Sequence, residues 1–330
     1  MAEQNPRPAF LNDFRRVALY LPPMRKTNMN KESLSKKIRN LAHSAGIDVL
    51  GFADASDFPN YALSNSRRRS PRLSLQDART IIVAGIYIGG LVLNEWKDPW
   101  YGRTSRLYLS GFFLDAVKPL ESILNFLINE GYQAIVCDSS SEAGSNLPLK
   151  LAAIRAGMGW QGKHSLLISK KYGTFLALGG IITNAELDHN TTEESNLCLK
   201  CDKCRKACPL SALDQPYVLN RSKCLSNCLQ TDHLSEDIKA VMENRVIDCE
   251  ICQQACPWNK SHIKNPLITG VTESFQKKTD ALKKIFYLPD LVKLSESEYQ
   301  KTLGYLDTCI PYEIFHRNVL MAIERVKQIN

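Results

Sequence analysis

Two closely spaced runs of cysteines limit what this chain can fold into. The runs are Cys198-x2-Cys201-x2-Cys204-x3-Cys208-Pro209 and Cys249-x2-Cys252-x3-Cys256-Pro257. This spacing is typical of bacterial ferredoxins, in which three thiolates of one run bind a [4Fe–4S] cluster and the fourth reaches the other cluster. Two clusters need eight thiolates, and the runs supply seven. The eighth must be Cys224 or Cys228, because these complete the nine cysteines between positions 198 and 256.

Two other uses of cysteine fit this segment less well. Zinc also binds paired Cys-x2-Cys motifs, but four cysteines at intervals of three, three and four before a proline exceed what one zinc ion needs. Disulfides belong to oxidising compartments, and an odd total of eleven cysteines without a secretory signal favours a reducing one. We therefore predict two iron–sulfur clusters.

Basic residues interleave the first run, namely Lys200, Lys203, Arg205 and Lys206. Their charge would partly offset the negative charge of a cluster with its thiolates, which is one influence on reduction potential. They are equally compatible with solvated loop side chains, and the sequence leaves both interpretations open.

The overall composition is that of an ordinary globular protein. A chain of 330 residues with 44% hydrophobic content can form two or three domains. The formal net charge of +8 permits a polyanionic partner such as RNA without demonstrating one. The longest apolar stretch, residues 81–93, is shorter than a membrane helix and contains three glycines. We expect a cytoplasmic monomer with no membrane partner.

Hydrophobic periodicity predicts an α+β fold in four parts. These are an N-terminal extension at 1–29, an α/β domain at 30–190, a ferredoxin-like double-cluster domain at 191–265, and C-terminal helices at 266–330 that pack on the body. In the α/β domain we expect helices at 34–45 and 112–129, the second kinked by a proline, and strands at 49–53, 80–88, 132–137, 166–169 and 174–183. The C-terminal helices are expected at 280–287, 296–303 and 312–326.

Two motifs of the α/β domain are candidates for ligand contact. The basic run Arg67-Arg68-Arg69-Ser70-Pro71-Arg72 is either a solvated loop or a phosphate contact. Three glycines surround Trp160, at 157, 159 and 162, and let the backbone approach a flat ligand closely, although a tight turn with Trp160 in the core fits as well. The chain has no GxGxxG fingerprint after a strand and no Walker loop, so nothing indicates a nicotinamide or nucleotide site.

Several separate segments resemble epoxyqueuosine reductases. They are Ala156-Gly157-Met158-Gly159-Trp160-Gln161-Gly162-Lys163-His164-Ser165, Leu178-Gly179-Gly180-Ile181, the two cysteine runs with Cys256-Pro257-Trp258-Asn259-Lys260, and Arg317-Asn318-Val319. Members of that family are cobalamin-dependent iron–sulfur enzymes, related to reductive dehalogenases, that reduce epoxyqueuosine in tRNA to queuosine. The resemblance runs from about residue 30 to 326 and does not include the C-terminal helical repeats of many members.

The resemblance implies a role for each group of residues. It assigns one cluster to Cys198, Cys201, Cys204 and Cys256, and the other to Cys208, Cys224, Cys249 and Cys252, which leaves Cys228 free. It also implies that the turn carrying Gly159, Trp160, Gly162, Lys163, His164 and Ser165 faces the corrin of cobalamin.

The substrate half departs from the family pattern. The family's Asp-Ser-x-Pro motif, whose aspartate is thought to protonate the substrate, falls here on Ala143 without gaps, and Asp138 and Glu142 are the candidate acids nearby. A second family motif, an Arg-Asp-Tyr-His-like run after Tyr-x-x-Gly, is replaced by Tyr108-Leu109-Ser110-Gly111 and Phe113-Leu114-Asp115.

The resemblance and the cysteine runs together predict a corrinoid-dependent iron–sulfur reductase. Electrons from an external donor of the ferredoxin or flavodoxin type would pass through the two clusters to cobalamin, and tRNA is the partner that the family suggests. Two alternatives stay open. One is a divergent, reductive dehalogenase-like enzyme acting on another substrate, and the other is a non-catalytic electron-transfer protein that reactivates another enzyme's corrinoid.

Overall fold

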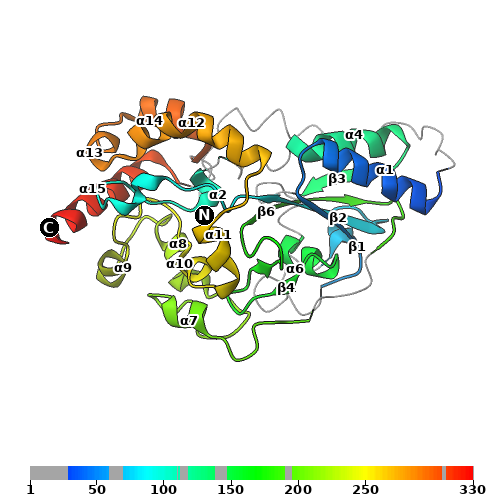
Figure 1. Ribbon diagram of the computed structural model, residues 1–330, viewed down its shortest axis with the longest axis horizontal. Helices are drawn as coiled ribbons and strands as arrows, with labels where there is room; N and C mark the ends of the chain where they lie inside the picture. Colours follow the sequence, from blue (N-terminus) through cyan, green and yellow to red (C-terminus); the bar gives the residue numbers. More distant parts are fainter. Residues whose placement is uncertain are drawn as a thin grey trace, which may run out of the picture.

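The chain has a sheet half and a helical half, with the cysteine segment between and below them (Figure 1). The computed structural model describes residues 29–58, 70–109, 111, 118–137, 147–189, 195–306 and 310–329. The candidate acids Asp138 and Glu142, the motif residue Asp115 and the three arginines at 67–69 lie outside these residues. The mixed helix and strand architecture confirms the predicted fold class.

A four-stranded antiparallel sheet forms the centre of the first half, in the order β1-β2-β6-β3. Its strands are β1 (Val49–Asp54), β2 (Thr80–Tyr87), β3 (Ala134–Cys137) and β6 (Leu176–Thr183). All residues of β2 are buried, as expected for a β-branched run in a central strand covered on both faces. In the register, Thr183 of β6 pairs with both Thr80 and Ala134.

Helices cover both faces of this sheet (Figure 1). They are α1 (Lys31–Ser44), η6 (Lys118–Leu120) and α4 (Glu121–Asn129) on one face, and α6 (Leu149–Arg155) on the other. Because strand side chains alternate between faces, Ile82 packs toward α1 and α4 while Ile81 and Val83 pack toward α6. The predicted first helix is confirmed, with Asn30 as its N-cap and Gly46 in a left-handed conformation just after its end.

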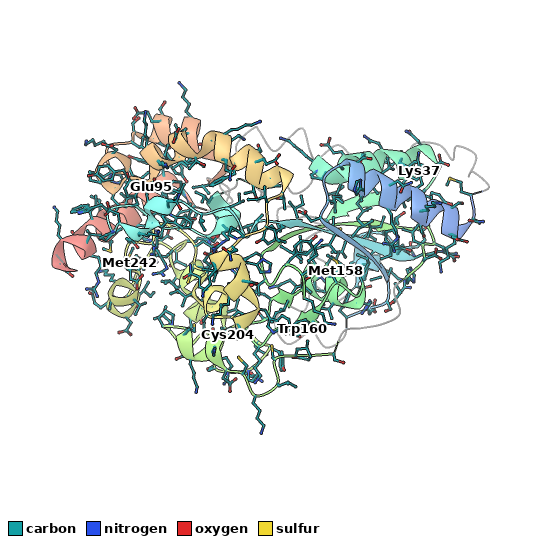
Figure 2. All side chains as sticks on the ribbon, in the orientation of Figure 1. Lys37, Glu95, Met158, Trp160, Cys204 and Met242 are labelled. Carbon is teal, nitrogen blue, oxygen red and sulfur yellow. The ribbon has the colours of Figure 1, made fainter. Side chains whose placement is uncertain are left out.

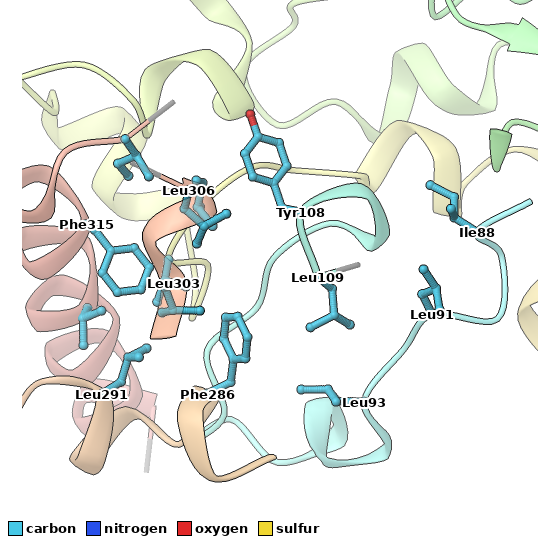
Figure 3. Packing of buried hydrophobic residues seen from close by; sticks show 14 of the residues in the cluster. Ile88, Leu91, Leu93, Tyr108, Leu109, Phe286, Leu291, Leu303, Leu306 and Phe315 are labelled. Atoms are coloured by element: carbon cyan, nitrogen blue, oxygen red, sulfur yellow. The ribbon is translucent and has the colours of Figure 1, made fainter. Parts of the chain in front are cut away.

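Residues 88–109, which we call the arm, leave the sheet after β2 and join the helical half. The arm contains η5 (Asn94–Lys97) and α2 (Arg106–Leu109). Its Leu91, Leu93 and Leu109 share one hydrophobic cluster with Phe286 and Phe315 of the C-terminal helices, and Figure 3 shows Leu93 and Leu109 directed toward Phe286. The C-terminal helices therefore form their core around a segment from the first third of the sequence.

Backbone hydrogen bonds fix the arm at several points. Gly102 donates its N–H to the carbonyl of Phe286 at 2.8 Å, and Leu288 donates to that of Trp100 at 2.9 Å. Arg103 donates to the carbonyl of Asn244 at 2.8 Å, so the arm is also bonded to the cysteine segment.

The C-terminal helices pack around the arm. They are α12 (Gly270–Phe286), α13 (Leu288–Leu291), α14 (Glu296–Leu303), η9 (Gly304–Leu306) and α15 (Tyr312–Ile329). The prediction of a helix at 280–287 was wrong about its start, because α12 begins ten residues earlier, after an N-cap at Thr269. The added turns are polar and bury only Thr272 and Phe275, so the sequence carries little periodicity there.

The cysteine segment consists of short helical turns. They are α7 (Lys203–Ala207), η7 (Arg221–Lys223), α8 (Leu225–Cys228), α9 (Glu236–Val241), α10 (Ile251–Gln254), η8 (Pro257–Asn259) and α11 (Lys260–Lys264). Asn318 of α15 is fully buried against this segment, and its amide donates to the carbonyls of Leu229 and Val246 at 2.8 and 2.9 Å. The Arg-Asn-Val motif thus holds the last helix on the cysteine segment.

Among the described residues, no helix combines the length and the apolar composition that crossing a bilayer requires.

Candidate iron–sulfur and cofactor site

Each cysteine run forms a helical turn that is stopped by a Cys-Pro pair. In the first run α7 ends at Ala207 and its C-cap Cys208 is extended ahead of Pro209, and in the second run Cys256 is extended ahead of Pro257. A residue before proline is pushed out of the helical conformation, so the proline turns the last cysteine of each run away from the others. Because α7 and α10 pack against each other, the last cysteine of one run reaches the other run.

Electrostatic influence links the eight expected thiols in two neighbouring groups, with Cys204 close to both. Burial, together with the neighbouring Cys198, Cys204 and Cys201, raises the pKa of Cys256 to about 11. Burial also raises the pKa of Cys252 well above its usual value, with Cys249, Cys224, Cys204 and Cys208 adding to the rise. Iron–sulfur ligands must be thiolates, so these buried thiols need a positively charged group to hold them deprotonated. The donor sets therefore fit the two clusters.

The structure separates Cys224 from Cys228. Cys208 and Asp248 are neighbours of Cys224, which places Cys224 with the second group. Cys228 is buried one helical turn later and donates its S–H to the carbonyl of Ser222 at 3.3 Å. The ligand sets that the resemblance implied, with Cys224 in the second set and Cys228 in neither, stay a prediction.

The glycine-rich turn packs against the first cysteine group. A two-stranded ribbon, β4 (Trp160–Gln161) and β5 (Leu167–Ile168), closes it. Gly159 has φ of +151°, and a Cβ there would lie 2.0 Å from the carbonyl oxygen of Ile168, so only glycine fits. Trp160 is buried, stacks edge-on with Trp258 at a centroid distance of 4.8 Å, and shares a hydrophobic cluster with Cys198 and Cys256. Figure 2 labels Trp160 and Cys204 on the lower side of the molecule.

An ion-pair network joins this turn to the first run. Lys163 Nζ lies 3.2 Å from Asp202 Oδ1, and Arg205 Nη1 lies 3.1 Å from the same oxygen. The hydrogen bonds from Arg205 and Lys163 hold the pKa of Asp202 below its usual value. Arg205 also donates to the carbonyls of Leu213 and Asp214, so it is a structural residue and not a free loop charge.

Three polar atoms of the turn are buried with no hydrogen-bond partner among the described residues. They are Trp160 Nε1, His164 Nε2 and Ser165 Oγ. His164 Nδ1 accepts from the backbone of Leu166 at 3.2 Å, and Ser165 has φ of +66°. Buried polar groups are almost always hydrogen-bonded, so these atoms fit a bound group with polar edges. The corrin-facing role of the turn stays a prediction.

His164 should make the protein less stable in acid. Burial, together with the charge of Lys150, lowers the pKa of His164 to about 4. With an unfolded pKa of about 6.5, its contribution is fully present above that pH and is lost as pH falls toward 4. Between pH 7 and pH 5, His164→Gln is expected to lose about 2 kcal/mol less unfolding free energy than the parent protein.

Denaturant titrations of cluster-loaded protein at the two pH values measure this difference. The exposed His43 offers a control, and His43→Gln should keep the pH dependence of the parent. Equal pH dependence in the parent and in His164→Gln would show that His164 is not buried in its neutral form.

Sequence reasoning missed a cavity of about 330 Å³ beside the second cysteine group. Its lining includes Arg103 and Arg106 of the arm together with Arg245 and Cys249 of the cysteine segment. Arg103 Nε and Thr104 Oγ1 are buried there without a hydrogen-bond partner among the described residues. No local motif marks this cavity, because the two segments that form it are about 140 positions apart in the sequence.

A buried ion pair connects the two walls of that cavity. The Arg106 guanidinium pairs with Glu250, which lies between two cysteines of the second run. The backbone N–H of Arg106 also donates to Glu250 Oε2 at 3.2 Å, and its Nε donates to the carbonyl of Gly89 at 3.0 Å. The guanidinium lies over the ring of Phe175, 4.2 Å from its centroid.

Arg72, the last residue of the basic run, lies elsewhere. It lines a second cavity of about 690 Å³ at the edge of the sheet, together with Arg79, Glu186 and His189. Its guanidinium is 4.0 Å from the carboxylate of Asp57, and both side chains are largely exposed.

Comparison with known proteins places the chain in a family. Residues 197–259 match the family model described as a 4Fe-4S double cluster binding domain. The chain is 31% identical over 251 residues to the epoxyqueuosine reductase of Lactococcus garvieae (strain Lg2), covering 69% of this chain and 70% of that one. The chain belongs to the epoxyqueuosine reductase family. The predicted pair of [4Fe–4S] clusters and the predicted class, an iron–sulfur oxidoreductase, are thereby confirmed.

Solved structures agree with this membership. A crystal structure of epoxyqueuosine reductase with an epoxyqueuosine-modified tRNA-Tyr stem loop matches with a TM-score of 0.75 at 22% identity, over 89% of this chain and 82% of that one. A reductive dehalogenase structure, titled as suggesting a mechanism for B12-dependent dehalogenation, matches with a TM-score of 0.51 at 16% identity, over 78% of this chain and 38% of that one. The epoxyqueuosine reductase fold therefore extends over nearly the whole chain.

Proposed function

We propose that this chain is a cobalamin-dependent reductase of epoxyqueuosine in tRNA. One observation carries the proposal: the glycine-rich turn, with its unpartnered polar atoms, packs against Cys198 and Cys256 of the two cysteine runs. When bound, cobalamin supplies the reducing centre that neither the clusters nor the side chains provide. The family membership and the tRNA complex of a relative support the substrate.

The chain's own residues have distinct tasks in this proposal. The eight cysteines hold the two clusters, which supply the electrons for the reduction. Trp160 and Gly159 shape the turn, and His164 and Ser165 offer polar atoms to the edge of the corrin. The net charge of +8 favours association with the phosphates of tRNA, and work on tRNA is consistent with a cytoplasmic enzyme.

Asp138 and Glu142 stay the proposed proton donors on sequence grounds. The ends of the segment that contains them are fixed, because Cys137 and Leu147 are buried in the same hydrophobic cluster. We expect one of the single variants Asp138→Asn and Glu142→Gln, and the double variant, to abolish turnover without loss of clusters. Full activity in the double variant would remove both residues from this role.

Anaerobic purification with added cobalamin tests the proposal. We expect about eight irons and one corrinoid per chain, and conversion of an epoxyqueuosine-containing tRNA stem loop to queuosine with a chemical reductant, detected by mass spectrometry. Corrinoid binding with dehalogenation of an organohalide but no turnover of the stem loop would favour the dehalogenase-like alternative. Eight irons without corrinoid would overturn the reductase and leave an electron carrier.

A further inference from the structure

The first cysteine run carries an unusual surface. Leu199, between Cys198 and Cys201, is 77% exposed, the highest value among the large hydrophobic side chains that the structure describes. Cys198 and Cys201 on either side of it are half-buried. The adjoining helix α7 lies at the periphery of the molecule (Figure 1). The first cluster is therefore bounded by solvent on the side of Leu199.

Leucine at position 199 does not stabilise the fold. Leu199 has φ of +40°, in the left-handed region that favours glycine and costs energy for a residue with a side chain. Its side chain is largely in water and so contributes little burial energy. A large apolar side chain in an unfavourable conformation beside a redox centre points to a contact outside the chain.

Positive charge surrounds this leucine. Lys200, Lys203 and Lys206 are exposed, and no described acidic side chain lies within ion-pair distance of them. Arg205, by contrast, is held by Asp202 in the network described above. We call Leu199, Lys200, Lys203 and Lys206 the entry surface: an exposed apolar centre with an uncompensated positive rim.

We propose that the entry surface docks an acidic one-electron carrier protein that reduces the first cluster. The inference rests on the proposed function, which requires an external electron donor. In the docked complex one electron leaves the reduced carrier and enters the cluster, so the carrier is oxidised by one electron and the cluster is reduced by one. The lysines attract an acidic partner from a distance, and Leu199 gives the encounter a short-range apolar contact.

The other polyanion in the system, tRNA, fits this surface less well. Phosphates need the lysines but have no use for an exposed leucine. The position of Leu199 between two cluster ligands is also what an electron partner requires, because it places the partner next to the redox centre.

The test uses cluster-loaded protein and a photoreduced acidic flavodoxin as the probe. Stopped-flow absorbance at low ionic strength measures cluster reduction, and a binding titration with the oxidised flavodoxin measures affinity without turnover. In the triple variant Lys200→Gln, Lys203→Gln, Lys206→Gln we expect the bimolecular rate constant and the affinity each to fall about tenfold, and their salt dependence to weaken. Leu199→Gly should also weaken both, while leaving the protein at least as stable, since glycine relieves the strain.

A matched control neutralises three exposed lysines of α12, Lys277, Lys278 and Lys284, which lie far from α7 (Figure 1). This variant should behave as the parent, and dithionite should reduce the clusters of all variants alike. Unchanged flavodoxin rates and affinities in the triple variant would overturn the proposal. The proposal would also be overturned if the triple variant lost binding of the tRNA stem loop while flavodoxin still reduced its clusters at the parent rate. That result would assign the surface to nucleic acid. Because cluster reduction is read directly, failure of epoxyqueuosine turnover leaves this test interpretable.

Discussion

Cys224→Ala is expected to bind about four irons per chain, where the parent protein and Cys228→Ala bind about eight. Cys224 lies with Cys208, Cys249 and Cys252 around the second centre. Cys228 is one helical turn away and bonds its thiol to the carbonyl of Ser222. Loss of one thiolate from a four-thiolate set removes the cluster, whereas loss of a buried free thiol removes only a small packing group.

Iron and sulfide analysis after anaerobic reconstitution measures the difference, and electron paramagnetic resonance of the reduced protein shows which cluster is left. Cys208→Ala should give the same spectrum as Cys224→Ala, and Cys204→Ala should retain the other cluster. The assignment is wrong if Cys228→Ala loses iron and Cys224→Ala does not.

Arg106→Met is expected to lower the free energy of unfolding by about 3–5 kcal/mol. Arg106 and Glu250 are both buried, and the substitution removes the guanidinium that pairs with the Glu250 carboxylate in the interior. The double variant Arg106→Met, Glu250→Gln removes both charges and should recover most of the loss. Denaturant titration of the cluster-loaded protein measures each value.

An exposed ion pair provides the comparison. Lys293 and Asp290 lie 3.1 Å apart on the surface, and Lys293→Met should change the unfolding free energy by no more than about 1 kcal/mol. If the double variant were as unstable as Arg106→Met alone, the loss would come from the packing of the Arg106 side chain on Phe175 and not from a stranded carboxylate.

Local patterns predicted the parts of the molecule that short spacing determines. The cysteine runs were recognised because the cluster needs its thiolates on one tight turn. The central strand was recognised because its sequence begins with a β-branched run, and all eight of its residues are buried. The bounds of α14 were predicted correctly, and its capping box with Ser295 and Glu298 is a local signal of the same kind.

What the sequence did not reveal depends on contacts between distant segments. Trp160 was a candidate for either the core or a flat ligand, and its actual neighbour Trp258 lies almost a hundred positions later. The arginines of the small cavity stand in no motif, and only the return of the arm to the cysteine segment brings Arg103 and Arg106 near Cys249. The spacing of residues within one segment does not predict which distant segment that segment contacts.

The path of the arm also limits how the chain can be split into fragments and how its parts can change in evolution. A fragment that ended near residue 190 would expose Leu93 and Leu109 to water, and the complementary fragment would leave Phe286 and Phe315 without the side chains they pack on. The iron–sulfur segment is therefore not an independently exchangeable domain in this chain, although its sequence resembles one. Evolution can vary the arm and the C-terminal helices only together, because part of the helical core is encoded in the first third of the sequence.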